Sequence, residues 1–360
     1  MNSINFDMYE YIVESKDAVR NIVVHQEEIL GDAVEYCGSN IEQIYIVGSG
    51  TSYHSALAAR NVLERTLKKK VFAVYPMSFK DNELITNKNT LVIGISHAGR
   101  SSSTIQALEK AKAEGLKTIA MTAERNRPII NHADKTVYIE IGPEYAGPKT
   151  KGFFGSVATL VLFGLNYGIK NGIINETEKN EIINRMLKTT DNIPDIAAKS
   201  WDWYKRNKED LLKSRRMIVL GYENCLASML EGTLKISEAV RYSVIGYEQE
   251  EFMHGIYHGI DEDTYMIYLA AKGQYYERCI RMKDYFEKER HNHNYLITSD
   301  KELDNGKNFV YDFVNDEYFE GLEYIVPLQV LARKLSQDLG IDCNISSDPE
   351  FHKKMASYTY

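Results

Sequence analysis

A chain of 360 residues, 44% of them hydrophobic, is too long for one ordinary core and too apolar for disorder, so two α/β domains are expected. The net charge of −8, without an extended basic face, argues against nucleic acid as a partner. The four cysteines form no CxxC pair and no cysteine–histidine spacing that would hold zinc. We expect reduced, mostly buried thiols, no metal site and no cofactor.

No basic segment followed by an apolar stretch occurs near Met1, and no uninterrupted apolar run reaches membrane-spanning length. We therefore predict a cytoplasmic protein that does not bind a membrane.

In chain order, residues 1–38 predict a helical arm, because apolar residues recur there at helical spacing. Residues 39–170 predict a first α/β unit with strands at 44–47, 71–74, 91–95, 118–121 and 136–141. These strands lack polar alternation, which predicts a parallel sheet covered by helices on both faces.

Residues 171–213 are polar and predict a helical connector. Residues 214–345 predict a second α/β unit, with strands at 217–220, 244–247, 265–270, 294–298 and 309–313 and a helix at 325–339. Residues 346–360 remain as a tail. Two similar series of strands indicate an internal duplication.

Small hydroxyl residues follow two predicted strands of the first unit, where helices should begin. Residues 48–52 read GSGTS, and residues 96–104 read SHAGRSSST. Such turns direct backbone N–H groups, hydroxyls and a helix dipole at one point, which suits the phosphate of a small molecule. One turn alone could be only a capped helix, but the two together favour phosphate binding.

The second unit carries ionisable residues with catalytic spacing. Lys235 and Glu238 are three apart on a predicted helix, so the ammonium can orient the carboxylate. His254 follows Glu238 by sixteen positions in a predicted loop. The alternative interpretation is a surface salt bridge from Glu238 to Lys235 or Arg241 and an ordinary loop histidine.

The two turns resemble those of the sugar isomerase (SIS) domain family, especially in the isomerase half of glucosamine-6-phosphate synthase. The resemblance covers nearly the whole chain. It implies two tandem SIS domains, each a three-layer αβα sandwich with a mainly parallel, flavodoxin-like sheet. The residues it places at the sugar phosphate are Ser49, Gly50, Thr51, Ser52, Ser96, His97, Ala98 and Ser101.

The second turn departs from the family's usual form. His97, Ala98 and Arg100 stand where the family has Gln, Ser and Glu, so a different sugar phosphate, or one with extra negative charge, is expected. Residues 144–153 resemble the loop that closes on the sugar, with Gly147 and Thr150 as its contacts.

The resemblance also assigns catalytic roles. It implies that Glu238 is the general base, that Lys235 supports it, and that His254 opens the sugar ring from a neighbouring subunit, which requires a homodimer. It places Lys354 near a lysine that forms a Schiff base with an open-chain ketose. The residues around Lys354 differ from the family, Lys353 lies beside it, and a tail lysine is ordinarily a solvated charge.

The synthase also needs a glutaminase domain, whose nucleophile is a cysteine directly after the initiator methionine. Asn2 occupies that position, so no glutamine hydrolysis is expected. Two-SIS proteins of this size resemble fructosamine-6-phosphate deglycases, amino-sugar-phosphate deaminases and ketose–aldose isomerases. The expected function is proton transfer between C1 and C2 of a 6-phosphorylated ketosamine or amino sugar. The alternatives are a simple ketose–aldose phosphate isomerase and a non-catalytic phosphosugar sensor.

Overall fold

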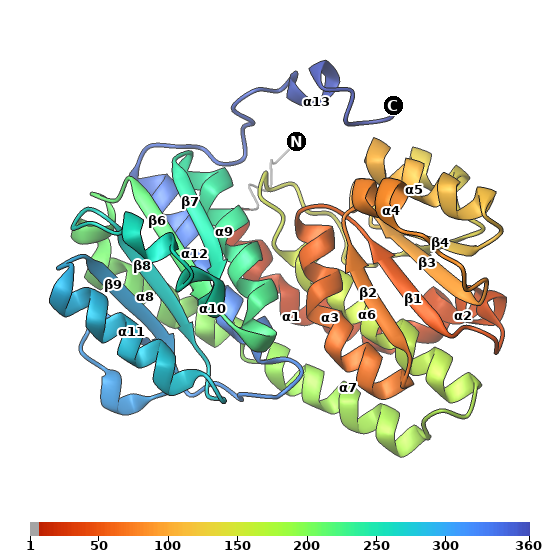
Figure 1. Cartoon of the computed structure of the whole chain (residues 1–360), viewed down its shortest axis with the longest axis horizontal. Helices are drawn as coiled ribbons and strands as arrows, with labels where there is room; N and C mark the ends of the chain where they lie inside the picture. Colours follow the sequence, from red (N-terminus) through yellow and green to blue (C-terminus); the bar gives the residue numbers. More distant parts are fainter. Residues whose placement is uncertain (1–6) are drawn as a thin grey trace, which may run out of the picture. The chain divides into compact units, whose positions relative to one another are not determined.

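The computed structural model describes residues 7–360, which fold into two compact α/β units (Figure 1). Unit 1 comprises residues 7–16, Tyr145–Thr150 and Lys188–Ile345. Unit 2 comprises Asp17–Glu144, Lys151–Leu187 and Ser346–Tyr360. The α/β prediction is confirmed. The segment boundaries 1–38, 39–170, 171–213, 214–345 and 346–360 stay a prediction, because the units are defined by compactness rather than by family domains.

Unit 2 is built on a parallel five-stranded sheet with the order β2-β1-β3-β4-β5. Its strands lie within a few residues of the predicted ones. The inner strands β1, β3 and β4 are almost entirely buried, as apolar runs without alternation require, whereas the edge strands β2 and β5 are mostly half-buried. Their bounds are β1 Gln43–Val47, β2 Lys70–Val74, β3 Thr90–Ile95, β4 Lys117–Thr122 and β5 Lys135–Tyr138.

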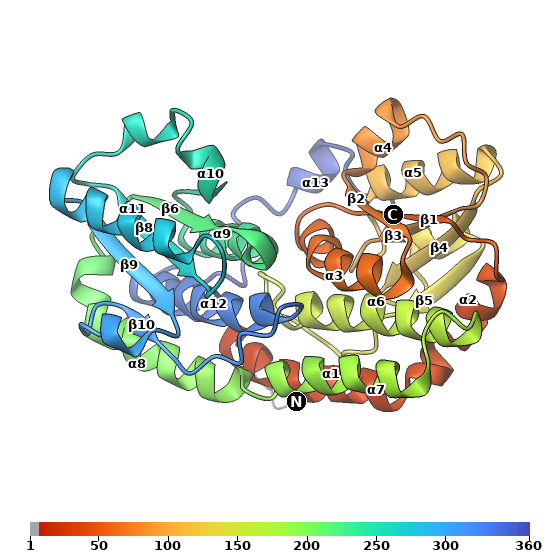
Figure 2. The ribbon, with the colours of Figure 1, turned by 60° about the horizontal axis from the view of Figure 1, so that its bottom comes forward.

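Helices cover both faces of this sheet (Figure 2). On one face, α4 (Pro76–Asn82) and α5 (Ser102–Ala113) pack on a core that includes Tyr45 and Val47 of β1. Alternate residues of a strand point to opposite faces of the sheet, so Ile44 and Ile46 lie on the other face. There lie α2 (Gln26–Cys37), α3 (Thr51–Leu67) and α6 (Lys151–Lys170).

Helix α6 is long and apolar enough to cross a membrane, the one such helix among residues 7–360, with a mean hydropathy of 1.5 over the relevant window. The sequence analysis did not single it out. However, 89% of that window is buried inside the structure. Gly164 lets α6 approach α3, since a Cβ there would lie 2.2 Å from Cδ2 of Leu63. These features are those of a core helix.

Unit 1 contains the second parallel five-stranded sheet, with the order β10-β9-β8-β6-β7. When β6 is matched to β1 and so on along the chain, this order equals that of unit 2, which agrees with the expected duplication. The bounds are β6 Arg216–Gly221, β7 Ser243–Glu248, β8 Tyr265–Ala270, β9 His293–Thr298 and β10 Phe309–Val310.

Helices again lie on both faces of the unit 1 sheet (Figure 2). Helices α10 (Gln249–Phe252) and α11 (Tyr276–Glu289) cover a core cluster that includes Tyr268 and Phe286. The other face carries α9 (Leu226–Val240) and α12 (Glu320–Asp338). Gly232 brings α9 against α12, because a Cβ at this glycine would lie 2.1 Å from Cδ1 of Leu328.

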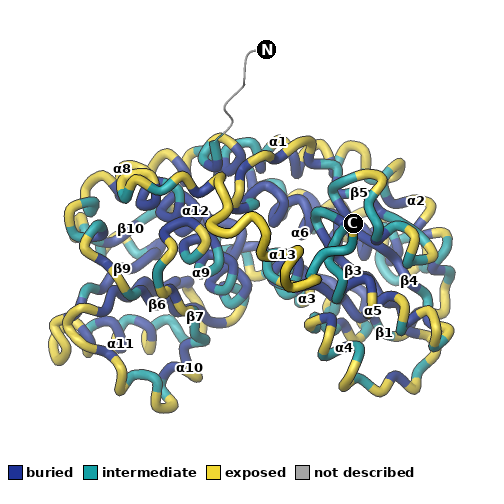
Figure 3. The backbone as a smooth tube through the Cα atoms, turned by 90° about the horizontal axis from the view of Figure 1, so that it is seen from above, coloured by how far each residue is buried: buried dark blue, intermediate teal, exposed yellow. Residues whose placement is uncertain are grey.

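Helices occupy the segments outside the sheets. The expected arm contains α1 (Met8–Val24) and α2, and the expected connector contains α7 (Glu176–Thr190) and α8 (Ile193–Leu211). All four cysteines are free and buried. Figure 3 shows the central strands β3 and β8 buried and the segment around α13 (Phe351–Lys354) largely exposed. Asn2, on which the argument against glutamine hydrolysis depends, lies outside the described residues.

Candidate functional site

The first hydroxyl turn joins β1 to α3 in unit 2. Gly48 cannot be replaced without rearrangement, because its Cβ would lie 2.8 Å from Cβ of Ser52. Gly50 has a φ of 55°, in the left-handed region that glycine tolerates. Helix α3 then begins at Thr51 with Ser52 buried behind it, while Ser49 is exposed. This confirms the predicted sequence of strand, turn and helix.

The second turn leaves the same edge of the sheet, since β1 and β3 are parallel neighbours with Val47 opposite Gly94. Ser96 organises this turn: its carbonyl accepts from Gly99 N–H at 2.9 Å, and its Oγ accepts from Ser101 N–H at 3.3 Å. Ser101 caps α5 by accepting the Thr104 N–H at 3.4 Å. The two turns therefore meet at the switch point of the strand order, where α/β folds bind ligands.

The departures from the family pattern have different surroundings. The ring of His97 packs on the backbone of α6, such that a Cβ on Gly152 would lie 2.5 Å from His97 Cε1. Ala98 contributes no hydroxyl. The guanidinium of Arg100, expected near the anion, lies 5.7 Å from the ring centroid of Tyr360.

The loop predicted to close on the sugar is anchored at both ends. In unit 2, the carboxylate of Glu144 accepts from the N–H groups of Lys151 and Gly152, both at 3.0 Å, and so caps α6. In unit 1, Gly147 donates its N–H to Asn344 Oδ1 at 3.2 Å. Thr150 is fully buried. The roles of Gly147 and Thr150 as sugar contacts stay a prediction.

The predicted catalytic pair lies on α9 in unit 1 and makes direct contact. Lys235 Nζ donates to Glu238 Oε2 at 2.8 Å, as the spacing of three predicted. The lysine side chain is only 2% exposed, whereas that of Glu238 is 42% exposed. A buried ammonium thus holds a carboxylate that is open to solvent, which suits a proton-transferring base.

Sequence reasoning missed a third member of this cluster, Glu231. Its fully buried carboxylate lies 3.6 Å from Lys235 Nζ, one turn earlier on the same helix. The spacing of four between Glu231 and Lys235 was the available signal. Lys235 therefore lies between two carboxylates.

His254 lies in the turn after α10, and Nδ1 is 2.7 Å from the carbonyl oxygen of Glu250. Glu238 is in the last turn of α9, which leads into the start of β7, whereas His254 follows the end of β7. Six residues of strand, roughly 20 Å, separate the two ends. One copy of unit 1 thus does not bring His254 to Glu238.

Lys354 ends the short helix α13 in unit 2. Its side chain is 60% exposed, and its ammonium lies 3.3 Å from the carboxylate of Asp348. Lys353 is also exposed, 3.6 Å from Glu350. The structure assigns neither lysine to a site, and the Schiff-base role of Lys354 stays a prediction.

Two buried carboxyls in the first turn of α12 were also missed. Glu320 is 5% exposed and lies 3.5 Å from the Asn224 amide, and Glu323 is fully buried, 2.8 Å from the Asn192 amide. Burial raises the pKa of both carboxyls to about 7, and the charges of Glu223 and Asp316 act in the same direction on Glu320.

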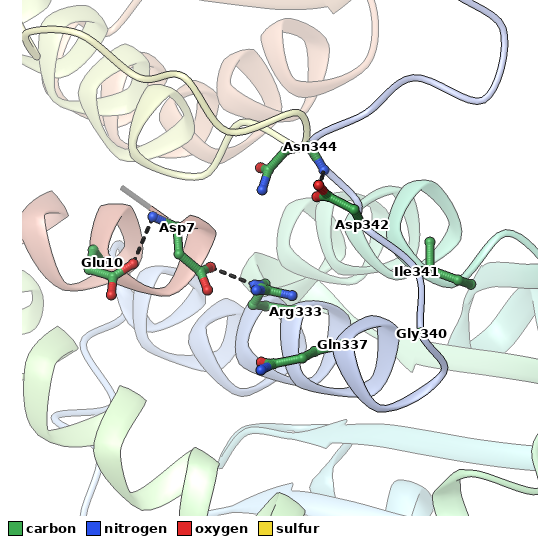
Figure 4. Close-up of a pocket in the computed structure, with 8 residues that line it drawn as sticks. All are labelled: Asp7, Glu10, Arg333, Gln337, Gly340, Ile341, Asp342 and Asn344. Carbon is green, nitrogen blue, oxygen red and sulfur yellow. Dashed lines mark hydrogen bonds and ion pairs between the residues drawn. The ribbon is translucent and has the colours of Figure 1, made fainter. Parts of the chain in front are cut away.

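A cavity of about 520 Å³ opens elsewhere in unit 1 (Figure 4). Asp7 Oδ1 accepts from Arg333 Nε at 2.5 Å beside it. Its wall includes Asn344, which also anchors Gly147. Within residues 7–360, no group of three or more His, Cys, Asp or Glu residues is placed to hold a metal ion.

Comparison with known proteins identifies the family. A model of the SIS domain matches residues 39–165, which include both hydroxyl turns. A solved structure of a candidate phosphosugar isomerase from Clostridium difficile 630 is 31% identical, with 99% of each chain covered and a TM-score of 0.92. This chain belongs to the SIS domain family.

Two further relatives of this SIS protein extend the comparison. A candidate sugar-binding protein from Salmonella typhimurium LT2 is 30% identical, with 91% of this chain and 98% of that chain covered and a TM-score of 0.82. A glutamine–fructose-6-phosphate aminotransferase (isomerizing) from Caldanaerobacter subterraneus subsp. tengcongensis is 26% identical over 344 residues, with 93% of this chain but 56% of that protein covered. The SIS protein thus spans about half the length of the curated relatives it matches.

Proposed function

We propose that this SIS protein is a cofactor-independent enzyme that transfers a proton between C1 and C2 of a 6-phosphorylated ketosamine or amino sugar, without glutaminase activity. The reaction would be that of a fructosamine-6-phosphate deglycase or of a glucosamine-6-phosphate deaminase or isomerase. The chain would contain two tandem SIS domains with different roles. The turns of unit 2 would bind the phosphate, and unit 1 would supply the proton-transferring residues.

The observation that carries the proposal is the exposed Glu238 carboxylate held at 2.8 Å by the buried Lys235 ammonium. In the proposed step, Glu238 removes a carbon-bound proton next to the carbonyl or imine, and the C–H electrons form the C1–C2 double bond of an enediol or enolamine. The electron pair of the C=O or C=N bond moves to its oxygen or nitrogen, which takes up a proton from solvent. The protonated Glu238 then gives its proton to the adjacent carbon. In a deglycase or deaminase, water adds to the resulting imine and the amine leaves, so no oxidant or reductant is needed.

His254 is proposed to open the cyclic sugar by moving a proton between the ring oxygen and the anomeric hydroxyl. Because β7 separates His254 from Glu238 in one chain, we propose a homodimer in which His254 of one copy serves Glu238 of the other. An imidazole ring can donate a proton from one nitrogen and accept one at the other, which suits this exchange.

The test uses Glu238→Gln, with Glu209→Gln on the exposed face of α8 as a control for the loss of one charge. Purified variants are incubated with glucosamine 6-phosphate and several fructosamine 6-phosphates, and glucose 6-phosphate, fructose 6-phosphate and released amine are followed. Loss of a general base should reduce kcat by about 10²- to 10⁴-fold, with KM changed little. Wild-type turnover in Glu238→Gln would refute the assignment. Saturable binding without turnover by the wild type would favour a sensor instead.

Subunit sharing is tested by mixing inactive Glu238→Gln with inactive His254→Asn. Half of randomly reassembled dimers contain one copy of each, and one of their two sites has both native residues, so about a quarter of the wild-type activity should return. No recovery in dimers shown to have mixed would refute the shared site.

A further inference from the structure

Helix α9, which carries Glu238, is tied at its end to a distant segment of unit 1. The helix ends on Arg241, a C-cap residue with a φ of 60°, in the left-handed region. The Arg241 guanidinium donates from Nη2 to the carbonyl oxygens of Asp342 at 3.1 Å and Ile345 at 2.5 Å. One side chain therefore connects the end of α9 to residues 342–345.

Residues 342–345 form a turn that is held by its own hydrogen bonds. The Asp342 carbonyl accepts the Ile345 N–H at 3.3 Å, and the Asp342 carboxylate accepts the Asn344 N–H at 2.9 Å (Figure 4). Cys343, between them, is buried. An aspartate that bonds to the backbone two residues on fixes the local conformation, so the position of Asn344 follows from that of the turn.

Asn344 contacts the loop Tyr145–Thr150, which also belongs to unit 1 and is the loop predicted to close on the sugar. Its Oδ1 accepts the Gly147 N–H at 3.2 Å. The two backbones pass close together there, because a Cβ on Gly147 would lie 2.3 Å from the carbonyl oxygen of Cys343. The turn therefore fixes the middle of the loop.

We infer that Arg241 is a positioning residue for the proposed reaction. Its guanidinium holds residues 342–345 on the end of α9, and Asn344 in turn holds Gly147. The loop thus keeps a fixed place relative to the helix that carries Glu238. Arg241 acts through Asn344 and not on the reacting atoms. This inference rests on the proposed function, because it concerns the loop that would close on the sugar.

This arrangement predicts which kinetic constant Arg241 controls. Glu238 is bonded to Lys235, and this contact does not involve Arg241, so kcat should change by less than about twofold when the guanidinium is lost. The loop, in contrast, would lose the support of its anchor and would have to be ordered by the sugar. The KM should therefore rise, by roughly threefold to tenfold for the loss of one or two hydrogen bonds. Glu238→Gln should give the opposite pattern.

The first test is Arg241→Gly, because glycine adopts a φ of 60° without strain and so keeps the end of the helix while the guanidinium is removed. The matched control is Lys68→Gly. Lys68 is the exposed C-cap of α3, the helix of unit 2 that corresponds to α9, and has a φ of 53°. Steady-state kinetics use glucosamine 6-phosphate, or the fructosamine 6-phosphate that the wild type turns over fastest. The KM should rise in Arg241→Gly and stay unchanged in Lys68→Gly, and equal effects would refute the inference.

A second pair of variants tests the contact with the loop. Asn344→Ala removes the acceptor of the Gly147 N–H and should raise the KM by a similar factor, whereas Asn344→Asp keeps an acceptor oxygen and should retain the KM of the wild type. Because Arg241 acts through Asn344, the double variant Arg241→Gly/Asn344→Ala should have about the KM of the more affected single variant. Effects that multiply in the double variant would contradict the inference.

Hydrogen exchange without substrate gives a measurement that does not depend on turnover. Exchange in Tyr145–Thr150 should be faster in Arg241→Gly and in Asn344→Ala than in the wild type. Unchanged exchange refutes the inference. Faster exchange with an unchanged KM also refutes it and leaves the proposed function standing. If the wild type turns over none of the sugars, the proposed function fails, and the positioning role fails with it.

Discussion

The buried carboxyl of Glu320 should make the stability of the folded protein depend on pH. Its ordinary pKa of 4.5 is raised to about 7 in the folded protein, first by burial and then by neighbouring carboxylates. At about 1.36 kcal/mol for each pH unit, this difference corresponds to about 3 kcal/mol. Below pH 4.5 the carboxyl is protonated in both the folded and the unfolded protein and does not lower the free energy of unfolding. As the pH rises from 4.5 to 7, the unfolded state loses the proton and the folded state does not, so stability falls, and above pH 7 it levels off.

The test is Glu320→Gln, whose side-chain oxygen can still accept from the Asn224 amide. We expect the variant to be more stable than the wild type by about 3 kcal/mol at pH 8 and by less than about 1 kcal/mol at pH 5. Guanidinium unfolding at the two pH values measures this. Because both tryptophans of the chain, Trp201 and Trp203, lie on α8 of unit 1, their fluorescence reports on the unit that contains Glu320.

Exposed Glu302→Gln, in the same unit, controls for the loss of one negative charge. It should change stability by less than about 0.5 kcal/mol at either pH. The reasoning is refuted if Glu320→Gln destabilises the protein at pH 8, if its effect is the same at pH 5 and pH 8, or if Glu302→Gln reproduces it.

Two further predictions concern helix packing and the second turn. Gly232→Ala would place a Cβ 2.1 Å from Leu328 and should lower the free energy of unfolding by about 1–3 kcal/mol in denaturant titrations. Gly31→Ala in α2, where nothing lies within 4 Å, should instead raise it by about 0.5–1 kcal/mol, and equal effects would contradict the packing argument. Ser101→Asp can still cap α5 through Thr104, so thermal unfolding should stay within about 2 °C of wild type, while repulsion of the ligand's phosphate should weaken calorimetric binding at least tenfold. Unchanged binding would show that Ser101 does not face the anion.

Much of the fold was predictable because buried parallel strands have sequences of consecutive apolar residues without polar alternation. The ends of the strands were not predictable. The expected strand at 136–141 ends as β5 at Tyr138, because the Ile139 N–H still bonds to the Thr122 carbonyl but the Ile141 N–H turns back to Ile139 at 2.9 Å. The last strand shortens in the same way, since Phe313 bonds to Tyr311 at 2.9 Å. Such turns depend on local backbone geometry that side-chain pattern does not encode.

The site was predictable where its residues share an element. Lys235 and Glu238 are neighbours by helical spacing alone, and the turn residues follow directly from the strands that precede them. The burial of Glu231 was not predictable, because a glutamate on a helix is ordinarily solvated. In unit 2, the backbone of residues 357–360 pairs with Arg100 and Ser102. This pairing joins two short segments far apart in the chain, and pairs this short have no periodic signal.

The order of segments along the chain has a consequence for synthesis. Residues up to Leu187 supply the sheet and most of unit 2, but its segment Ser346–Tyr360 is translated only after Lys188–Ile345 of unit 1. At about 5–20 residues per second, the ribosome needs roughly ten to thirty seconds to make the intervening segment. During that interval the carbonyl of Arg100 and the N–H of Ser102 in unit 2 lack the backbone partners that Thr359 and Ser357 later supply.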